Sequence, residues 1–177
     1  MDNYGVDSTK AILQSFSNSK DIDIQSFLRD KAIDYNKRKW CYTYLIVQSD
    51  MLEHNGEVIV EGYFTLSNKV IGLDSNVSNT TKKKLFFGLK MDDTSLPCIL
   101  IGQLGKYIGE DRVSSIDMDE ILDYAMDIIE QINHLIAFSC VLLEYEPSRT
   151  GLRDKYEKYK FKELQRTDGY VQMFYIL

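Results

Sequence analysis

The part of this chain best suited to chemistry is an apolar stretch followed by a polar segment and an amphipathic helix. Leu96–Leu104 is almost entirely apolar, which predicts a buried strand. Apolar residues then recur at helical spacing from Met118 to Ile136. The first N–H groups of a helix lack intrahelical partners and carry partial positive charge, so a helix that follows a buried strand can bind an anion. Many nucleotide-type cofactors are bound in this way.

The start of that helix also carries acidic residues. Asp117 with Glu120 three residues later predicts a capping box in its acidic form. Glu144 and Glu146, near the end of a second apolar stretch, are candidates for a general base, although alternating glutamates are also common on the exposed face of a strand. No GxSxG, Walker or GxGxxG motif is present, which excludes the conventional hydrolase and nucleotide-binding patterns.

The cysteines and histidines indicate no metal site. Cys41, Cys98 and Cys140 are widely spaced in apolar runs, which favours small buried side chains over a disulfide framework. The sequence has two histidines and no CxxC or HxxxH motif, so we expect no zinc.

Length and charge limit the class of protein. The 177 residues suit one domain, so residues 1–177 are expected to form a single unit. No apolar stretch approaches the ~18 residues of a membrane span, and the N-terminus lacks the pattern of a signal peptide, so we expect a cytoplasmic protein with no membrane partner. A net charge of −6 disfavours whole-surface affinity for nucleic acid. Lys82–Lys84 and Arg149–Arg166 are nevertheless basic, and are read either as solvated faces or as contacts to a phosphate-bearing ligand.

Periodicity and turn residues predict the remaining elements. Trp40–Gln48 and Glu57–Leu66 are expected to form a hairpin around a turn at Asp50–Gly56, and Trp40 and Tyr42 to pack in the core or at an interface. The other predictions are a helix from Ile24 to about Lys39, a loop at Asn68–Thr80, a short basic helix at Ser78–Leu89, a strand at Phe138–Tyr145, a helix at Arg149–Tyr159, and strands at Phe161–Leu164 and Val171–Ile176 around Asp168-Gly169. This order predicts an α/β or α+β sandwich in which helices cover a mixed sheet.

Four segments, in this order, resemble the GCN5-related N-acetyltransferases, and most closely the toxin-type branch found in bacterial toxin–antitoxin pairs. They are Phe16–Leu28 with the helix after it, Gly62–Ser67, Ile99–Gly105 and Lys155–Phe161. The resemblance runs over about residues 11–177. It implies a largely antiparallel twisted sheet with helices on both faces.

The resemblance also implies transfer of an acetyl group from acetyl-CoA to an amine. By this resemblance, the end of the central strand, at Gln103, Leu104, Gly105 and Lys106, holds the pantetheine arm and thioester of acetyl-CoA. A backbone donor there would stabilise charge on the thioester oxygen. The tyrosine of the family's phenylalanine-tyrosine-glutamate motif corresponds to Tyr156, which would protonate the departing thiolate as general acid.

The chain departs from the family where the pyrophosphate should bind. Family members carry a Gln/Arg-x-x-Gly-x-Gly/Ala loop, and the corresponding segment is Ser114–Asp119, with Ser114 and Ser115 as the expected contacts. Asp117 and Asp119 would oppose the pyrophosphate by ~1 kcal/mol per close exposed pair in water. Lys106, Arg112 and Lys82–Lys84 could compensate; otherwise cofactor binding is weak or lost. The alternative to an enzyme is therefore a degenerate, non-catalytic binding protein with the same fold.

The implied acceptor is a primary amine on a protein, a small molecule or an aminoacyl-tRNA. The basic segments suit a tRNA backbone, whereas the acidic helix Asp117–Glu130 does not. The C-terminal strand Val171–Ile176 is apolar on both faces, which suggests a homodimer or an antitoxin as partner.

Overall fold

The computed structural model describes residues 5–88 and 95–177, and the chain forms two compact units. Unit 1 comprises Met1–Leu66 and Gln103–Met126, and unit 2 comprises Ser67–Gly102 and Asp127–Leu177. The helices are α1 (Val6–Gln14), α2 (Ile22–Ser26), the π-helical turn η1 (Phe27–Lys31), α3 (Ala32–Lys37), α4 (Ser49–Asn55), α5 (Asn79–Leu85), α6 (Met118–Asn133) and α7 (Leu152–Lys158). The strands are β1 (Tyr42–Val47), β2 (Val60–Gly72), β3 (Ser95–Lys106), β4 (Cys140–Tyr145), β5 (Lys162–Thr167) and β6 (Tyr170–Tyr175).

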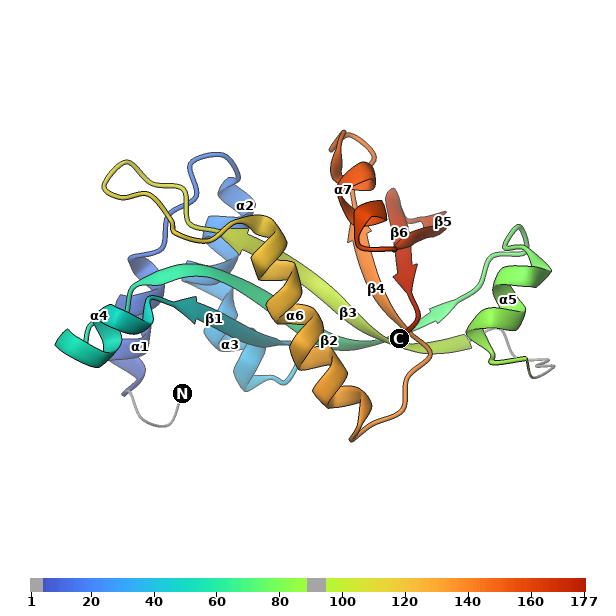
Figure 1. The fold of residues 1–177 in the computed structure, drawn as a ribbon, viewed down its shortest axis with the longest axis horizontal. Helices are drawn as coiled ribbons and strands as arrows, with labels where there is room; N and C mark the ends of the chain where they lie inside the picture. Colours follow the sequence, from blue (N-terminus) through green and yellow to red (C-terminus); the bar gives the residue numbers. More distant parts are fainter. Residues whose placement is uncertain (1–4, 89–94) are drawn as a thin grey trace. The chain divides into compact units, whose positions relative to one another are not determined.

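The strands form one six-stranded sheet with the order β1-β2-β3-β4-β6-β5 (Figure 1). The pairs β1–β2, β4–β6 and β5–β6 are antiparallel, whereas β3 and β4 run parallel. The predicted strand at Leu96–Leu104 is therefore central, and the mixed, largely antiparallel sheet is confirmed.

Unit 1 buries both faces of its part of the sheet. Tyr63 of β2 belongs to a core with Leu13, Phe16 and Leu28 from the N-terminal helices. On the opposite face, a Cβ added at Gly62 would approach Ile121 of α6. Because side chains alternate along a strand, these two contacts place helices on both faces of β2 in this unit.

Unit 2 has its own core between strands and α5. Its buried members are Ile71, Leu73, Val77, Leu85, Leu96, Cys98, Cys140, Leu142, Leu164 and Phe174. Cys98 and Cys140 are paired across the β3–β4 ladder, and their sulfurs lie 3.4 Å apart as free thiols. Their burial agrees with the expectation of small apolar side chains, whereas Cys41 is only partly buried.

Two predicted segments are wrong in secondary structure. The expected turn at Asp50–Gly56 is the short helix α4, which ends at Gly56 with a left-handed φ of 66°. The expected loop at Asn68–Thr80 begins instead as strand, because β2 continues to Gly72. The antiparallel pairing of β1 with β2 is confirmed. Part of the predicted helix at Ser78–Leu89 is α5, and Leu89 lies outside the described residues.

The C-terminal strand does not present a free edge. β6 lies between β4 and β5 and pairs with both, and Val171, Gln172, Met173 and Phe174 are buried. The apolar faces of this strand therefore lie in the core of the chain itself, and its backbone groups serve two ladders, so the strand offers neither a face nor an edge to a partner; a homodimer or an antitoxin elsewhere on the chain stays a prediction. Within residues 5–88 and 95–177, no helix is long and apolar enough to cross a membrane.

Candidate functional site

At the end of β3, the N–H and carbonyl of Leu104 point to the edge of the strand that faces away from β2. The N–H of Tyr107, just after β3, donates to the carbonyl of Glu61 on β2 at 2.8 Å. Backbone groups of alternate residues in a strand point to opposite edges. Those of Gly105 therefore point toward β2, and those of Leu104 point to the other edge.

That other edge is paired on both sides of Leu104. The parallel ladder with β4 extends as far as Ile101. Further along, the carbonyl of Lys106 accepts a hydrogen bond from Asn18 Nδ2 at 3.0 Å, and Asn18 forms an isolated parallel bridge with Ile108. Leu104 belongs to neither pairing, so its N–H and carbonyl are placed to bind an extended ligand along the strand.

Gly105 is required because Tyr63 crosses the strand directly over it. A Cβ at this position would clash with Cε1 of Tyr63, and would lie 2.7 Å from Cγ2 of Ile24. Tyr63 cannot easily move, because it is fully buried and its hydroxyl donates to the carbonyl of Ile24 at 2.7 Å. Gly105 thus has a packing role beside its predicted role in cofactor binding.

Replacing Gly105 with Ala should lower the free energy of unfolding by about 1–3 kcal/mol, because overpacking forces Tyr63 or the strand to shift. Urea unfolding followed by circular dichroism measures the change. Gly72→Ala is the control, since a Cβ there meets nothing within 4 Å. Equal losses in the two variants would show that the cost comes from glycine replacement in general and not from contact with Tyr63.

A buried carboxylate holds the segment between β3 and α6. Glu61 is 1% exposed and accepts hydrogen bonds from Arg112 Nη1 at 2.8 Å and from the N–H of Ser115 at 2.7 Å. Arg112 also donates to the carbonyl of Val60 at 2.7 Å, and its guanidinium lies 3.5 Å from the centre of the Tyr107 ring. The segment is therefore fixed to β2 through one ion pair and several hydrogen bonds.

The same contacts occupy the predicted pyrophosphate loop. Ser114 is buried and its hydroxyl donates to the carbonyls of Glu61 and Ile116 at 3.3 and 3.4 Å. The N–H of Ser115 already binds the Glu61 carboxylate. A phosphate at this N–H would have to replace a carboxylate of the protein itself.

The capping box at the start of α6 is confirmed. Asp117 Oδ1 accepts from the N–H groups of Asp119 and Glu120 at 2.7 and 2.9 Å, and Glu120 Oε2 accepts from the N–H of Asp117 at 2.7 Å. These N–H groups are thus capped by the protein's own carboxylates, which reduces what the helix start can offer to an external anion.

Sequence reasoning missed Glu61. The signal available was a single acidic residue inside the otherwise apolar run from Val58 to Phe64, apart from Gly62. A charge at such a position is buried only with a partner. The partner, Arg112, is 51 residues away and follows no recognisable motif.

Tyr156 is the buried aromatic residue of α7 in unit 2. It is 8% exposed, and its ring centre lies 5.9 Å from that of Tyr145 at the end of β4 and 6.4 Å from that of Phe161. Burial raises the pKa of Tyr156 to about 12; nearby Arg149 acts to lower it and Tyr145 to raise it. Among the described residues the one buried side-chain oxygen or nitrogen without a hydrogen-bond partner is Thr43 Oγ1, so the Tyr156 hydroxyl is not a buried unsatisfied group. Tyr156 is therefore a protonated donor at neutral pH.

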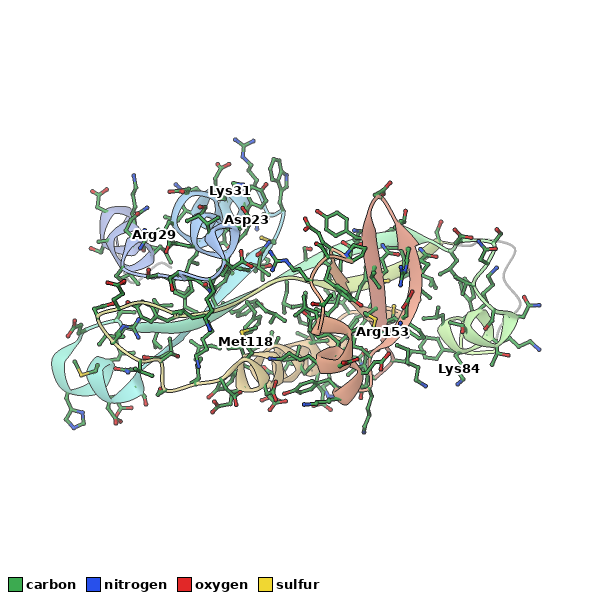
Figure 2. All side chains as sticks on the ribbon, turned by 90° about the horizontal axis from the view of Figure 1, so that it is seen from above. Asp23, Arg29, Lys31, Lys84, Met118 and Arg153 are labelled. Carbon is green, nitrogen blue, oxygen red and sulfur yellow. The ribbon has the colours of Figure 1, made fainter. Side chains whose placement is uncertain are left out.

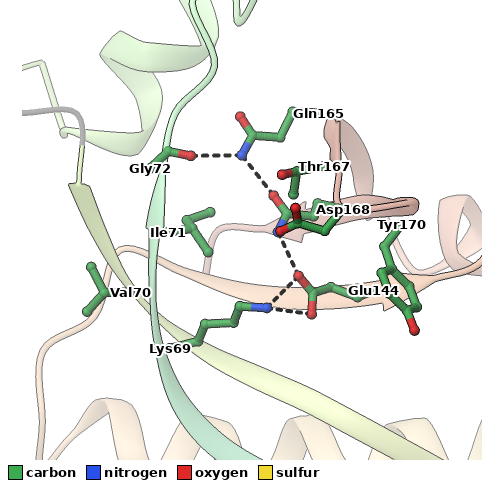
Figure 3. A pocket seen from close by; sticks show the side chains of 10 residues that line it. Lys69, Val70, Ile71, Gly72, Glu144, Gln165, Thr167, Asp168 and Tyr170 are labelled. Carbon is green, nitrogen blue, oxygen red and sulfur yellow. Dashed lines mark hydrogen bonds and ion pairs between the residues drawn. The ribbon is translucent and has the colours of Figure 1, made fainter.

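The candidate base Glu144 is part of a closed polar network in unit 2. Its carboxylate accepts from Lys69 Nζ at 2.7 and 2.6 Å and from Gln172 Nε2 at 2.6 Å (Figure 3). Gln165 continues the network to Gln172 and to the carbonyl of Gly72, along a cavity of about 380 Å³. Glu144 is thus engaged as an ion-pair partner, whereas Glu146 is exposed.

The predicted site residues divide between the two units. The four residues predicted to bind the pantetheine arm lie at the end of β3 in unit 1: Gln103, Leu104, Gly105 and Lys106. In the same unit, Glu61 contacts Ser114 and Ser115. Tyr156 lies in unit 2. Among the described residues, no group of three or more His, Cys, Asp or Glu side chains is placed to hold a metal ion.

No protein-family model and no curated protein matches this sequence, but several solved structures are similar to it in three dimensions. One is AtaT complexed with acetyl-methionyl-tRNAfMet, with a TM-score of 0.70 and 16% identity, matching 93% of this chain and 86% of that one. A tyrosine-to-phenylalanine mutant of KacT has a TM-score of 0.68 and 15% identity, with the same coverage. A third is an AtaT tyrosine-to-phenylalanine mutant toxin bound to acetyl-CoA and the C-terminus of the antitoxin AtaR (TM-score 0.65, 13% identity, 93% and 84% coverage).

Proposed function

Because this chain has the fold of the GCN5-related N-acetyltransferase toxins, we propose that it transfers an acetyl group from acetyl-CoA to a primary amine. The observation that carries the proposal is Tyr156, whose ring is buried and whose raised pKa keeps its hydroxyl protonated at neutral pH. The rings of Tyr145 and Phe161 pack against the Tyr156 ring and hold it in position, so its protonated hydroxyl can act as a fixed donor to a bound ligand.

The end of β3 fits the thioester end of acetyl-CoA. Leu104 offers an N–H and a carbonyl on an edge that is paired on either side of it, which suits the extended, amide-bearing pantetheine arm. A backbone donor fixed in a strand needs no reorganisation as negative charge develops on the thioester oxygen. We assign binding of the arm to Gln103, Leu104, Gly105 and Lys106.

The loop at Ser114 and Ser115 fits the pyrophosphate less well. The Ser115 N–H is paired with Glu61, and Asp117 caps α6. Arg112 brings a positive charge to this loop, but Glu61 already neutralises it. We therefore expect most of the binding energy for acetyl-CoA to come from the pantetheine and thioester contacts.

Tyr156 acts in the proposed reaction as general acid. The acceptor amine attacks the thioester carbonyl, the carbon–sulfur bond breaks, and the Tyr156 hydroxyl donates a proton to the departing sulfur. The amine must lose a proton in the same reaction. Glu144 would have to exchange its bonds with Lys69 and Gln172 to take it, so water is the simpler acceptor.

We propose an aminoacyl-tRNA amino group as the acceptor, and an antitoxin as the partner, by analogy with what is bound in the AtaT structures. A protein or small-molecule amine is the alternative acceptor. The capped α6 and the paired Ser115 favour a second function, in which the chain is a non-catalytic protein that keeps the fold and binds a partner.

Calorimetric titration with acetyl-CoA and CoA at low salt separates these functions. Binding in the micromolar range, followed by release of CoA with aminoacyl-tRNA but not with deacylated tRNA, is expected for the enzyme. Absence of binding at millimolar acetyl-CoA would overturn catalysis and leave the binding protein. Binding of acetyl-CoA with CoA release only on another amine would reject the tRNA substrate alone.

A further inference from the structure

A basic and aromatic surface lies where α3 turns into β1 in unit 1. We call Lys37, Arg38, Lys39, Trp40 and Tyr42 the Trp40 surface; all five residues are exposed. Trp40 is 56% exposed and Tyr42 is 48% exposed. Of the two alternatives for Trp40 and Tyr42, packing in the core is therefore wrong, and packing at an interface stays a prediction.

The backbone holds Trp40 in a defined position. The N–H of Trp40 donates to the carbonyl of Tyr35 at 3.0 Å, and the N–H of Lys39 donates to that of Asn36 at 3.1 Å. Lys39 has a left-handed φ of 58°. This is the hydrogen-bond pattern of a Schellman motif, which ends a helix and fixes the residue after the turn.

Two side chains then orient the indole. The Tyr35 ring packs edge-on against it, with centroids 5.0 Å apart and planes at 80°. The Arg38 guanidinium carbon lies over the ring at 5.1 Å, and Arg38 Nε is held by Asp34 Oδ2 at 2.8 Å. Trp40 is thus an ordered, exposed aromatic ring beside a fixed cation.

The charges around this ring are predominantly positive. Lys37, Arg38 and Lys39 are three consecutive cations in a chain of net charge −6, and Asp34 pairs with Arg38 alone of the three in the described contacts. The contact with Tyr35 explains how one edge of the Trp40 ring is held. It does not explain why the ring is exposed or why three cations lie beside it. An aromatic ring for stacking with cations for phosphates is the pattern that binds unpaired nucleotides.

We propose that the Trp40 surface binds single-stranded nucleic acid, with a base stacked on Trp40 and phosphates contacted by Lys37 and Lys39. The inference goes beyond the proposed acetyl transfer and needs neither acetyl-CoA nor Tyr156. It places an RNA or DNA contact on a segment different from Lys82–Lys84 and Arg149–Arg166, the basic segments noted in the sequence.

Trp40 is the only tryptophan of the chain, so its fluorescence reports directly on this surface. Titration with a single-stranded oligouridylate should quench the emission, because a stacked base contacts the indole. The same titration with its duplex should give much weaker quenching. The full-length protein without acetyl-CoA is used throughout, so failure of the proposed enzyme activity leaves this result unaffected.

Variants separate stacking from charge, with fluorescence anisotropy of a labelled oligouridylate as the readout. Trp40→Ala should weaken binding by about tenfold or more, as expected for loss of one stacked base. The pair Lys37→Gln and Lys39→Gln should reduce the slope of log affinity against log salt by about 1.4, at ~0.7 for each single-strand phosphate contact. The matched control is Lys10→Gln with Lys20→Gln, two exposed cations of unit 1 outside the basic segments, unlike Lys82–Lys84 of α5, where Lys84 is labelled in Figure 2.

Three results would overturn the proposal. One is an unchanged affinity of Trp40→Ala for the oligouridylate. If Trp40→Ala fails to fold, an unchanged affinity of Tyr42→Ser is the corresponding result. Another is the same change of salt slope in the control with Lys10→Gln and Lys20→Gln. The third is equal quenching by polyglutamate, which would identify an acidic polypeptide as the occupant of the surface.

Discussion

Tyr156→Phe is expected to lower kcat for acetyl transfer by about 10²- to 10⁴-fold, the usual contribution of a general acid. The affinity for acetyl-CoA should stay within about twofold, since the ring remains and only the hydroxyl is lost. The packing of the ring against Tyr145 and Phe161 is unaffected by the change. CoA release measured with a thiol reagent gives kcat, and calorimetry gives the affinity.

The pH dependence of this effect follows from the raised pKa of Tyr156. A pKa of about 12 keeps the hydroxyl protonated throughout the neutral range, so its contribution to the rate should not change there. The contribution should fall only as the pH approaches 12. An unfolded tyrosine ionises near pH 10, whereas buried Tyr156 stays neutral up to about pH 12. The free energy of unfolding therefore falls as the pH rises from 10 to about 12. Tyr156→Phe should remove that alkaline loss.

Tyr124→Phe is the matched control for loss of a hydroxyl. Tyr124 lies on α6 and is 47% exposed, so its hydroxyl can bind water. We expect its kcat to equal that of the unmodified protein. If Tyr156→Phe also keeps full kcat while acetyl-CoA binds, Tyr156 is not the acid.

Glu61→Ala should lower the free energy of unfolding by about 3–5 kcal/mol, as found when one partner of a buried ion pair is removed. The variant leaves Arg112 without its carboxylate, and the N–H of Ser115 without its acceptor. Urea unfolding measures the loss. We also expect faster proteolysis between Tyr107 and Asp117 in the native protein, because the segment loses its anchor to β2.

Glu157→Ala controls for the removal of a carboxylate in an ion pair. Glu157 pairs with Arg153 one helical turn away, and both side chains are about half exposed, at 46% and 52%. Exposed pairs of this kind contribute about 0.2–1 kcal/mol, so the loss should be small. A comparable loss in the two variants would contradict the assignment of Glu61 as the anchor.

Elements with a continuous periodicity were predictable. The apolar run at Leu96–Leu104 identified the central strand, and the Asp117 and Glu120 spacing identified the start of α6. The short helix α4 was not predictable, because Gly56 signals both a turn and a helix C-terminus. β2 extends past Ser67 because its partners in the sheet, not its local sequence, decide where it ends.

The site was predictable only where a motif marks it. The roles of Tyr156 as general acid and of the end of β3 in cofactor binding were predicted from the resemblance, and they remain predictions. The contact of Glu61 with Arg112 spans 51 residues, and that of Lys69 with Glu144 spans 75. Such pairs form because a buried charge needs a partner, and the sequence does not show which cation the fold brings to it.

The ladder between β3 and β4 has a consequence for the order in which the chain folds. Cys98 and Cys140 are 42 residues apart, whereas β5 and β6 are joined by the tight turn Asp168-Gly169. Closing a longer loop costs more chain entropy, by ~0.6 kcal/mol per doubling of length. The hairpins β1–β2 and β5–β6 should therefore form early, and the central parallel pair last. We therefore expect the sheet to assemble from its margins and its central ladder to close last, across the long connection that contains α6.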